Sequence, residues 1–143
     1  MFLKQLTVFV ENKKGALVKI TDTLAKNNIN IRALSIADTE EYGILRLIVS
    51  DNDAAIKTLG EKGFLIKTVD VLGVKIGDAP GKLSEALAVL DSADINMEYL
   101  YAFMSRTEKH AYVVMRVADN NAAQKVLTDA GFKMISDSDV EKL

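Results

Sequence analysis

The sequence consists of two similar halves, and this repeat limits the folds that the chain can adopt. A shift of 66 positions aligns the first part of each half, and a shift of 68 positions aligns the remainder. The identical pairs include Gly15/Gly81, Leu17/Leu83, Leu24/Leu90, Ile29/Ile95, Asn30/Asn96, Leu34/Leu100, Val49/Val117, Asp51/Asp119, Asn52/Asn120, Ala54/Ala122, Ala55/Ala123, Lys57/Lys125, Leu59/Leu127, Gly63/Gly131 and Phe64/Phe132. A duplicated sequence predicts a duplicated structure. We therefore expect two homologous modules, residues 1–68 and 69–143, with no flexible linker between them.

Each half shows the order strand, helix, strand, strand, helix, strand. In the first half, apolar patterns predict strands at 6–10, 29–38, 44–50 and 64–66, with helices at 16–28 and after Asp51. In the second half, they predict strands at 71–76, 95–104, 111–117 and 132–135, with helices at 82–93 and 122–130. This βαββαβ order predicts an α+β fold of two tandem ferredoxin-like modules, each an antiparallel sheet with its helices on one face. Because such small modules have thin cores, we also expect the two sheets to pair.

The first helix of each half follows a turn that contains glycine. The two turns are Asn12–Leu17 and Asp78–Leu83. The free N–H groups and the positive dipole end of a helix that starts in this way suit a carboxylate or a phosphate. The competing interpretation is that Asn12 and Asp78 only cap the helices. Asn30 and Asn96 recur at the start of a strand, where asparagine is uncommon, although they could simply end a helix there.

Composition excludes several classes of function. The net charge is −2 and the basic residues are scattered, which is not the pattern of a nucleic-acid-binding protein. No apolar run approaches the ~18 residues that span a membrane, and the sequence has no cysteine. A cytoplasmic protein without a metal or a cofactor is the expectation. We expect His110 to be a solvated turn residue, and the tail Asp137–Asp139 to be a frayed end.

The repeated motif resembles the ACT domain. Each copy reads strand, then Asn/Asp-x-x-Gly-x-Leu, then a helix that ends in Asn-Ile-Asn-Ile or Asp-Ile-Asn-Met. Two copies cover nearly the whole chain, and Ile95–Phe103 is similar to stand-alone tandem ACT proteins of bacteria and archaea. The resemblance implies ferredoxin-like modules that bind small effectors, mostly amino acids, and regulate amino-acid metabolism. It also implies modules paired side by side into one eight-stranded sheet, with ligands at the joint.

The family also implies which residues bind the ligand. One wall of its site is the loop before the first helix, and the other is the start of the second strand. The residues that match these walls in the first half are Asn12, Gly15, Ala16, Leu17, Asn30 and Ile31. Those in the second half are Asp78, Gly81, Lys82, Leu83, Asn96 and Met97. Two departures matter: Lys14 replaces a common proline, and Asp78 stands where the first half has Asn12, so the two sites can differ in ligand preference.

The sequence thus predicts a non-enzymatic sensor that binds an amino acid between ACT modules, acts on an enzyme of amino-acid metabolism and forms a homodimer. One alternative is a regulatory subunit that binds a partner enzyme but no ligand. A second is an acylphosphatase-like hydrolase, which would need an arginine above an anion-binding loop, and neither turn contains one. A third is an RNA-binding module, which would need a basic sheet face and aromatic side chains on the first and third strands of a half. The third strands supply only Tyr112, and the aromatic set Tyr99, Tyr101 and Phe103 lies on a second strand.

Overall fold

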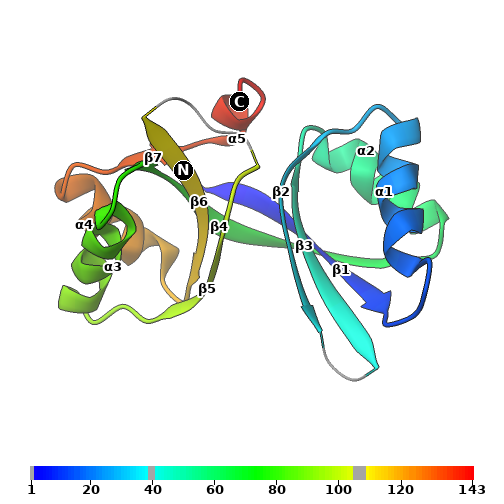
Figure 1. Cartoon of the computed structure of the whole chain (residues 1–143), viewed down its shortest axis with the longest axis horizontal. Helices are drawn as coiled ribbons and strands as arrows, with labels where there is room; N and C mark the ends of the chain where they lie inside the picture. The colour runs from blue at the N-terminus through cyan, green and yellow to red at the C-terminus, as the bar shows by residue number, and fades with distance from the viewer. Residues whose placement is uncertain (1, 39–40, 105–108) are drawn as a thin grey trace. The chain divides into compact units, whose positions relative to one another are not determined.

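The protein is described by a computed structural model that covers residues 2–38, 41–104 and 109–143 (Figure 1). The chain divides into two compact units. One unit is Lys4–Val69, and the other joins the start of the chain, up to Leu3, to Asp70–Leu143. The sequence-predicted boundary between residues 68 and 69 stays a prediction.

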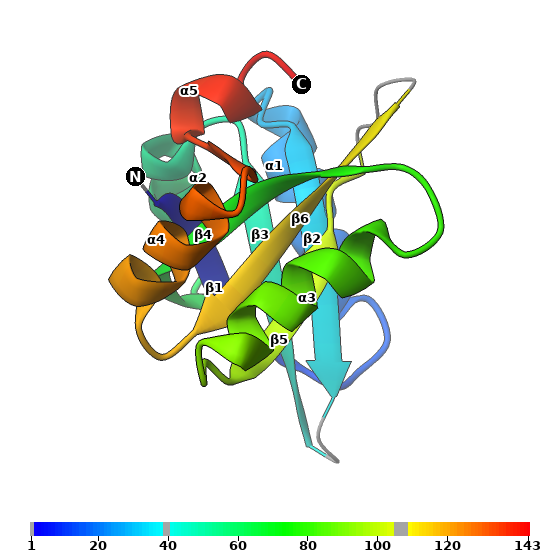
Figure 2. The same ribbon diagram turned by 90° about the vertical axis from the view of Figure 1, so that its left-hand side faces the viewer.

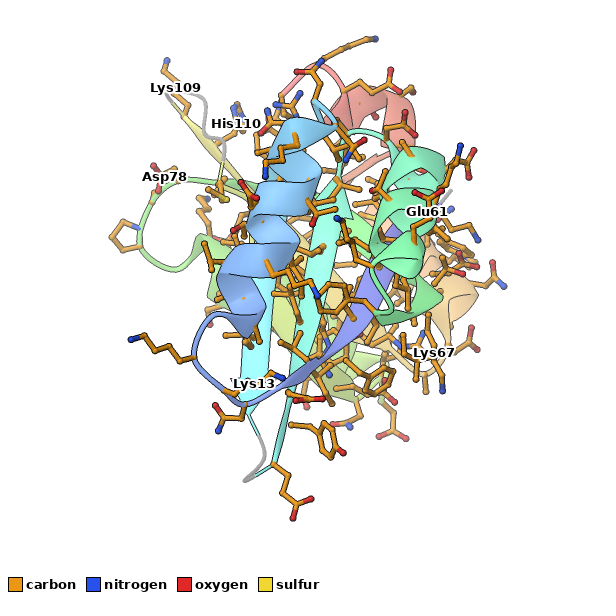
Figure 3. All side chains as sticks on the ribbon, turned by 90° about the vertical axis from the view of Figure 1, so that its right-hand side faces the viewer. Lys13, Glu61, Lys67, Asp78, Lys109 and His110 are labelled. Carbon is orange, nitrogen blue, oxygen red and sulfur yellow. The ribbon has the colours of Figure 1, made fainter. Side chains whose placement is uncertain are left out.

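The first unit contains one sheet and two helices. Its elements are β1 (Leu3–Glu11), α1 (Ala16–Lys26), β2 (Ile31–Asp38), β3 (Tyr42–Val49), α2 (Asn52–Glu61) and the beginning of β4 (Leu65–Gly77). The strand order is β2-β3-β1-β4, and β3 pairs antiparallel with both β1 and β2. Figure 3 shows α1 and α2 on one face of these strands. The core between the layers is made of alternate strand residues and one stripe of each helix: Leu6, Val8, Val10, Ala16, Ile20, Leu24, Ile29, Leu45, Leu47, Val49, Ala55 and Leu59.

The second unit repeats this architecture. The rest of β4 is followed by α3 (Lys82–Ser92), β5 (Met97–Ala102), β6 (His110–Val117), α4 (Asn120–Asp129), β7 (Lys133–Ile135) and α5 (Asp137–Val140). The strand order is β5-β6-β4-β7, with antiparallel pairs throughout. Figure 2 shows α3 and α4 on one face of the sheet. Its core contains Leu72, Val74, Ile76, Ala86, Leu90, Val113, Met115, Val117, Ala123 and Leu127. Both units therefore have the ferredoxin-like order, which confirms the α+β fold class.

The described residues form seven strands where the sequence predicts eight. The predicted strands at 64–66 and 71–76 are one strand, β4. The connecting residues, Lys67–Asp70, include neither glycine nor proline, so nothing in the backbone interrupts the extended conformation. The predicted count of eight strands is therefore one too many for the described residues. The side-by-side pairing of the two modules stays a prediction.

Both ends of the chain are placed differently from what the sequence predicts. Leu3 is fully buried, and its Cδ1 lies 2.5 Å from the position that a Cβ on Gly73 would occupy, so the start of the chain packs in the second unit. The tail is not frayed: it forms α5, which begins with a capping box at Ser136. The Ser136 N–H donates to Asp139 Oδ2 at 2.8 Å, and this bond together with that from the Ser136 hydroxyl lowers the pKa of Asp139. The signal that was missed is Ser-x-x-Asp.

Candidate functional site

The loop before α1 leaves the helix without a side-chain cap. Gly15 is the N-cap residue, its φ is 87°, and no side chain accepts a hydrogen bond from the first turn. Asn12 and Lys14 are exposed, and the Asn12 N–H donates to the Glu41 carbonyl at 3.1 Å. The first helical hydrogen bond runs from the Lys19 N–H to the Gly15 carbonyl. The N–H groups of the residues between them have no partner inside the helix.

The loop before α3 has the same geometry. Gly81 is the N-cap residue with a φ of 89°, and again no side chain caps the helix. The Asp78 N–H donates to the Lys109 carbonyl at 2.9 Å, as the Asn12 N–H does to the opposite hairpin in the first unit. Figure 3 shows the labelled Asp78 and Lys109 at one end of this unit. The interpretation that Asn12 and Asp78 cap the two helices is therefore wrong, because neither side chain reaches the first turn.

The two glycines are required by backbone conformation and not by space. A Cβ added to Gly15 or Gly81 would meet no heavy atom within 4 Å. A positive φ is nevertheless a conformation that glycine adopts without the penalty that other residues incur. Each helix therefore begins at a residue that cannot offer a side-chain oxygen to the first turn.

The two loops differ in charge. The first turn of α1 contains no acidic residue, whereas that of α3 contains Glu85. In the first loop Lys13 pairs with Glu11 at 2.9 Å. In the second loop Lys82 pairs with Glu85 at 3.4 Å, and Asp78 adds a further carboxylate. The start of α1 is thus the more positive of the two and the better place for a carboxylate ligand.

Asn30 and Asn96 lie at the other end of the same helices. Asn30 is exposed and directly precedes β2, and its backbone N–H donates to Ser50 Oγ at 2.9 Å. Asn96 is also exposed and borders a cavity of about 380 Å³ with Met97 at the end of α3. Ile31 and Met97 are partly buried against the cores of their units, so packing explains both.

The predicted residues of one module do not converge on one point. Residues Gly15–Leu17 lie at the start of α1 and Asn30 lies beyond its end. An 11-residue helix separates these groups, and at 1.5 Å per residue its length is about 16 Å. The second unit keeps Gly81–Leu83 apart from Asn96 in the same way. A single module therefore presents two half-sites, and the twelve predicted binding residues stay predictions.

The remaining expectations concern metal binding, membrane spans and single side chains within residues 2–38, 41–104 and 109–143. No cluster of three or more histidine, cysteine, aspartate or glutamate side chains could hold a metal there. No helix in these segments is long and apolar enough to cross a membrane. His110 is not a solvated turn residue: it begins β6, is partly buried and pairs with Gly77. The aromatic residues Tyr101 and Phe103 are mostly buried, at 8% exposure each.

Comparisons with known proteins agree with the fold. The family model described as an ACT domain pair matches residues 1–143. A crystal structure of a protein from Bacteroides thetaiotaomicron is 38% identical with a TM-score of 0.93, over 100% of this chain and 98% of that one. The regulatory subunit of aspartate kinase from Thermus thermophilus is 14% identical with a TM-score of 0.63, over 90% and 91% of the two chains.

The regulatory subunit of aspartate kinase from Thermus flavus is 17% identical with a TM-score of 0.59, over 89% of this chain and 91% of that one. The likeness to the two Thermus subunits concerns the fold. No sequence among functionally curated proteins matches the chain.

Proposed function

Because the chain belongs to the ACT domain pair family, we propose that it is a non-enzymatic regulatory protein that binds an amino acid between ACT modules. The observation that carries this proposal is the pair of uncapped helix starts at Gly15 and Gly81. The other long helices, α2 and α4, are capped by Asp51 and Asp119. The two open starts are equivalent in the repeat, which supports a common role for them.

The proposed ligand contacts follow from the chemistry of the two half-sites. The α-carboxylate accepts hydrogen bonds from the first-turn N–H groups at Leu17 or Leu83, where the helix dipole favours a negative charge. The α-amino group donates to the exposed side-chain amide oxygen of Asn30 or Asn96. Since one module holds these groups about 16 Å apart, the complete site takes its loop from one module and its asparagine from another, as the family resemblance implies.

The regulatory role is proposed from the family. Two of the similar structures are regulatory subunits of aspartate kinase, and we propose that this protein likewise acts on a partner enzyme of amino-acid metabolism in the cytoplasm. A ligand that contacts two modules stabilises the arrangement in which these modules are paired. If the partner enzyme binds the paired and unpaired arrangements differently, the ligand alters the affinity for that enzyme. A homodimer is part of the proposal, because β2 ends the strand order of its unit and exposes Leu34 and Ile36.

A thermal-shift screen with each common L-amino acid at millimolar concentration tests the proposal. A ligand at about 100 times its dissociation constant stabilises by about 2.7 kcal/mol, which raises the Tm of a chain of this size by about 5–10 °C. We expect one or two amino acids to do so. Asn30→Ala and Asn96→Ala should lose the shift and remain folded. Asn121→Ala is the matched control, because Asn121 is exposed on α4 and is not among the proposed ligand contacts.

The absence of a shift with every amino acid would overturn the binding proposal. The alternative, a regulatory subunit that binds its partner without a ligand, would then account for the family membership. A shift that persists in both asparagine variants would show binding elsewhere and would reject the proposed contacts.

A further inference from the structure

Each unit contains a cavity beside the turn that leads from its second helix into its last strand. The cavity of the first unit measures about 230 Å³ and is lined by Phe9, Lys13, Ala16, Lys19, Lys62 and Phe64, among others. That of the second unit measures about 460 Å³, and its lining includes Lys75, Lys82, His110, Gly131, Phe132 and Lys133. The repeat aligns Ala16 with Lys82 and Phe64 with Phe132. The two cavities therefore occupy the same place in the fold.

Both cavities carry the same excess of positive charge. Three lysines and one glutamate, Glu11, line the first cavity. Three lysines and one glutamate, Glu85, line the second. The lysines are not copies of one another, because Lys19 aligns with Glu85 and Lys62 aligns with Ala130. Duplication alone does not explain why both cavities are basic in a chain whose net charge is −2.

Part of this charge is uncompensated. In the first cavity Lys13 pairs with Glu11 at 2.9 Å, and Lys19 Nζ lies 5.5 Å from the centre of the Phe64 ring. Within the described part of the chain, neither Lys19 nor Lys62 forms an ion pair with a carboxylate.

Part of the positive charge of the second cavity is also neutralised by carboxylates. Lys82 pairs with Glu85 at 3.4 Å, and Lys133 acts electrostatically on Asp139. Across the segments that the structure describes, Lys75 has no carboxylate partner. Each cavity thus keeps at least one ammonium group available to an anion.

We propose that each of these cavities binds a small oxyanion with two negative charges, such as the phosphate group of a metabolite. The ammonium groups act as point charges with rotatable donors, a common way in which proteins hold phosphate. The phenylalanine rings reduce the access of water to one side of the anion, which strengthens its attraction to the lysines. Ala16 and Lys82 belong both to these cavities and to the loops of the proposed amino-acid site. The phosphate proposal does not rest on that site, because the cavity lysines come from the sheet, the helices and the turn inside a single module, whereas the amino-acid site takes its groups from two modules.

Titration with inorganic phosphate, at constant ionic strength with chloride as the balancing anion, tests the proposal by backbone amide NMR. The amide signals of Gly63 and Phe64, and those of Gly131 and Phe132, should shift with saturation. The double variant Lys19→Gln/Lys62→Gln should weaken binding at the first cavity by about tenfold or more, because charge-assisted hydrogen bonds are lost. The second cavity of the same molecule should respond as in the unaltered protein.

The matched control is Lys26→Gln/Lys57→Gln, which removes the same charge from α1 and α2 outside the cavity. Its phosphate response should equal that of the unaltered protein, and Asn30→Ala/Asn96→Ala should also retain it. The absence of shifts at both cavities would overturn the proposal. An equal loss in the control double variant would also overturn it, because the effect would then be one of net charge alone.

Discussion

The helices of this molecule begin in two ways, and the repeat separates them cleanly. In α2 and α4 the side chains of Asp51 and Asp119 accept hydrogen bonds from the first turn, each at 3.0 Å. In α1 and α3 a glycine occupies the same position and no side chain caps the turn. Aspartate at the N-cap position of α2 and α4 shows that this fold accommodates side-chain caps, yet α1 and α3 lack them. We infer that the starts of α1 and α3 are open for a reason other than local stability.

The largest expected effect concerns the glycines. Gly15→Ala or Gly81→Ala should lower the free energy of unfolding by about 1–2 kcal/mol, because alanine is strained at a positive φ. No clash contributes, since a Cβ would meet nothing at either position. Gly60→Ala is the control: its added Cβ also meets nothing, but Gly60 lies inside α2, so the change should stabilise by about 0.5–1 kcal/mol. Urea denaturation measures the stability of the three variants. Equal effects at Gly15, Gly81 and Gly60 would contradict the assignment of a special backbone conformation to the starts of α1 and α3.

The next prediction compares the caps directly. Asp51→Ala and Asp119→Ala should each cost about 1 kcal/mol of stability, because the first turn loses a hydrogen-bond acceptor. Asn12→Ala and Asp78→Ala should change stability by less than about 0.5 kcal/mol, as exposed substitutions usually do. The midpoints of urea denaturation measure these changes in stability, provided that the dependence of the free energy of unfolding on urea concentration is the same in all variants. A cost at Asn12 similar to that at Asp51 would mean that the loop does cap its helix in solution.

A carboxylate introduced into the first turn should close the open start. Val18 is 64% exposed in the first turn of α1, and Ser84 is its exposed counterpart in α3. Val18→Asp should stabilise the free protein by about 0.3–1 kcal/mol through the helix dipole. The same change should abolish the thermal shift caused by an amino acid at that site. Retention of the full shift in this variant would reject the first-turn N–H groups as the carboxylate contact.

The smallest effect is expected at α5, which has a third kind of start. Its capping box lowers the pKa of Asp139, first through the Ser136 N–H. Because this pKa is lower in the folded protein than in the unfolded chain, the ionised Asp139 carboxylate contributes to stability. The contribution is fully present above the pKa of the unfolded chain, and it is lost as the pH falls through the pKa of the folded protein. The stability difference between the unaltered protein and Asp139→Asn should therefore shrink as the pH falls below about 4. Thermal unfolding at several pH values measures it, and a difference independent of pH would contradict this assignment.

The order of the elements could be predicted because the repeat and the apolar periods are local signals. Glycine before Ala16 and Lys82 marked the helix starts correctly, and the helix predicted after Asp51 begins at Asn52. The wrong division of β4 into two strands has a different origin. When no glycine or proline separates two apolar patterns, the sequence alone does not show whether they form one strand or two. The placement of Leu3 in the second unit depends on packing against Gly73 and Ile135, which no local pattern reports.

The candidate site was predictable only in part. The loop residues were identified because their pattern occurs twice, but the separation of Gly15 from Asn30 follows from the length of α1 in three dimensions. The basic cavities were not foreseen, because Lys19 and Lys62 are far apart in sequence and the second cavity uses lysines at other positions. The repeated Gly-Phe pair was the only local signal of their place in the fold.

The most direct test of the central claim is a backbone amide NMR titration of the unaltered protein with the amino acid that gives the largest thermal shift. We expect saturable shifts of the first-turn amide signals at Leu17 and Val18 in α1, or at their counterparts in α3. The signals of Ala54 and Ala122, whose N–H groups already donate to aspartate side chains, should stay in place. Shifts confined to the capped helices, or spread equally over all four starts, would contradict it.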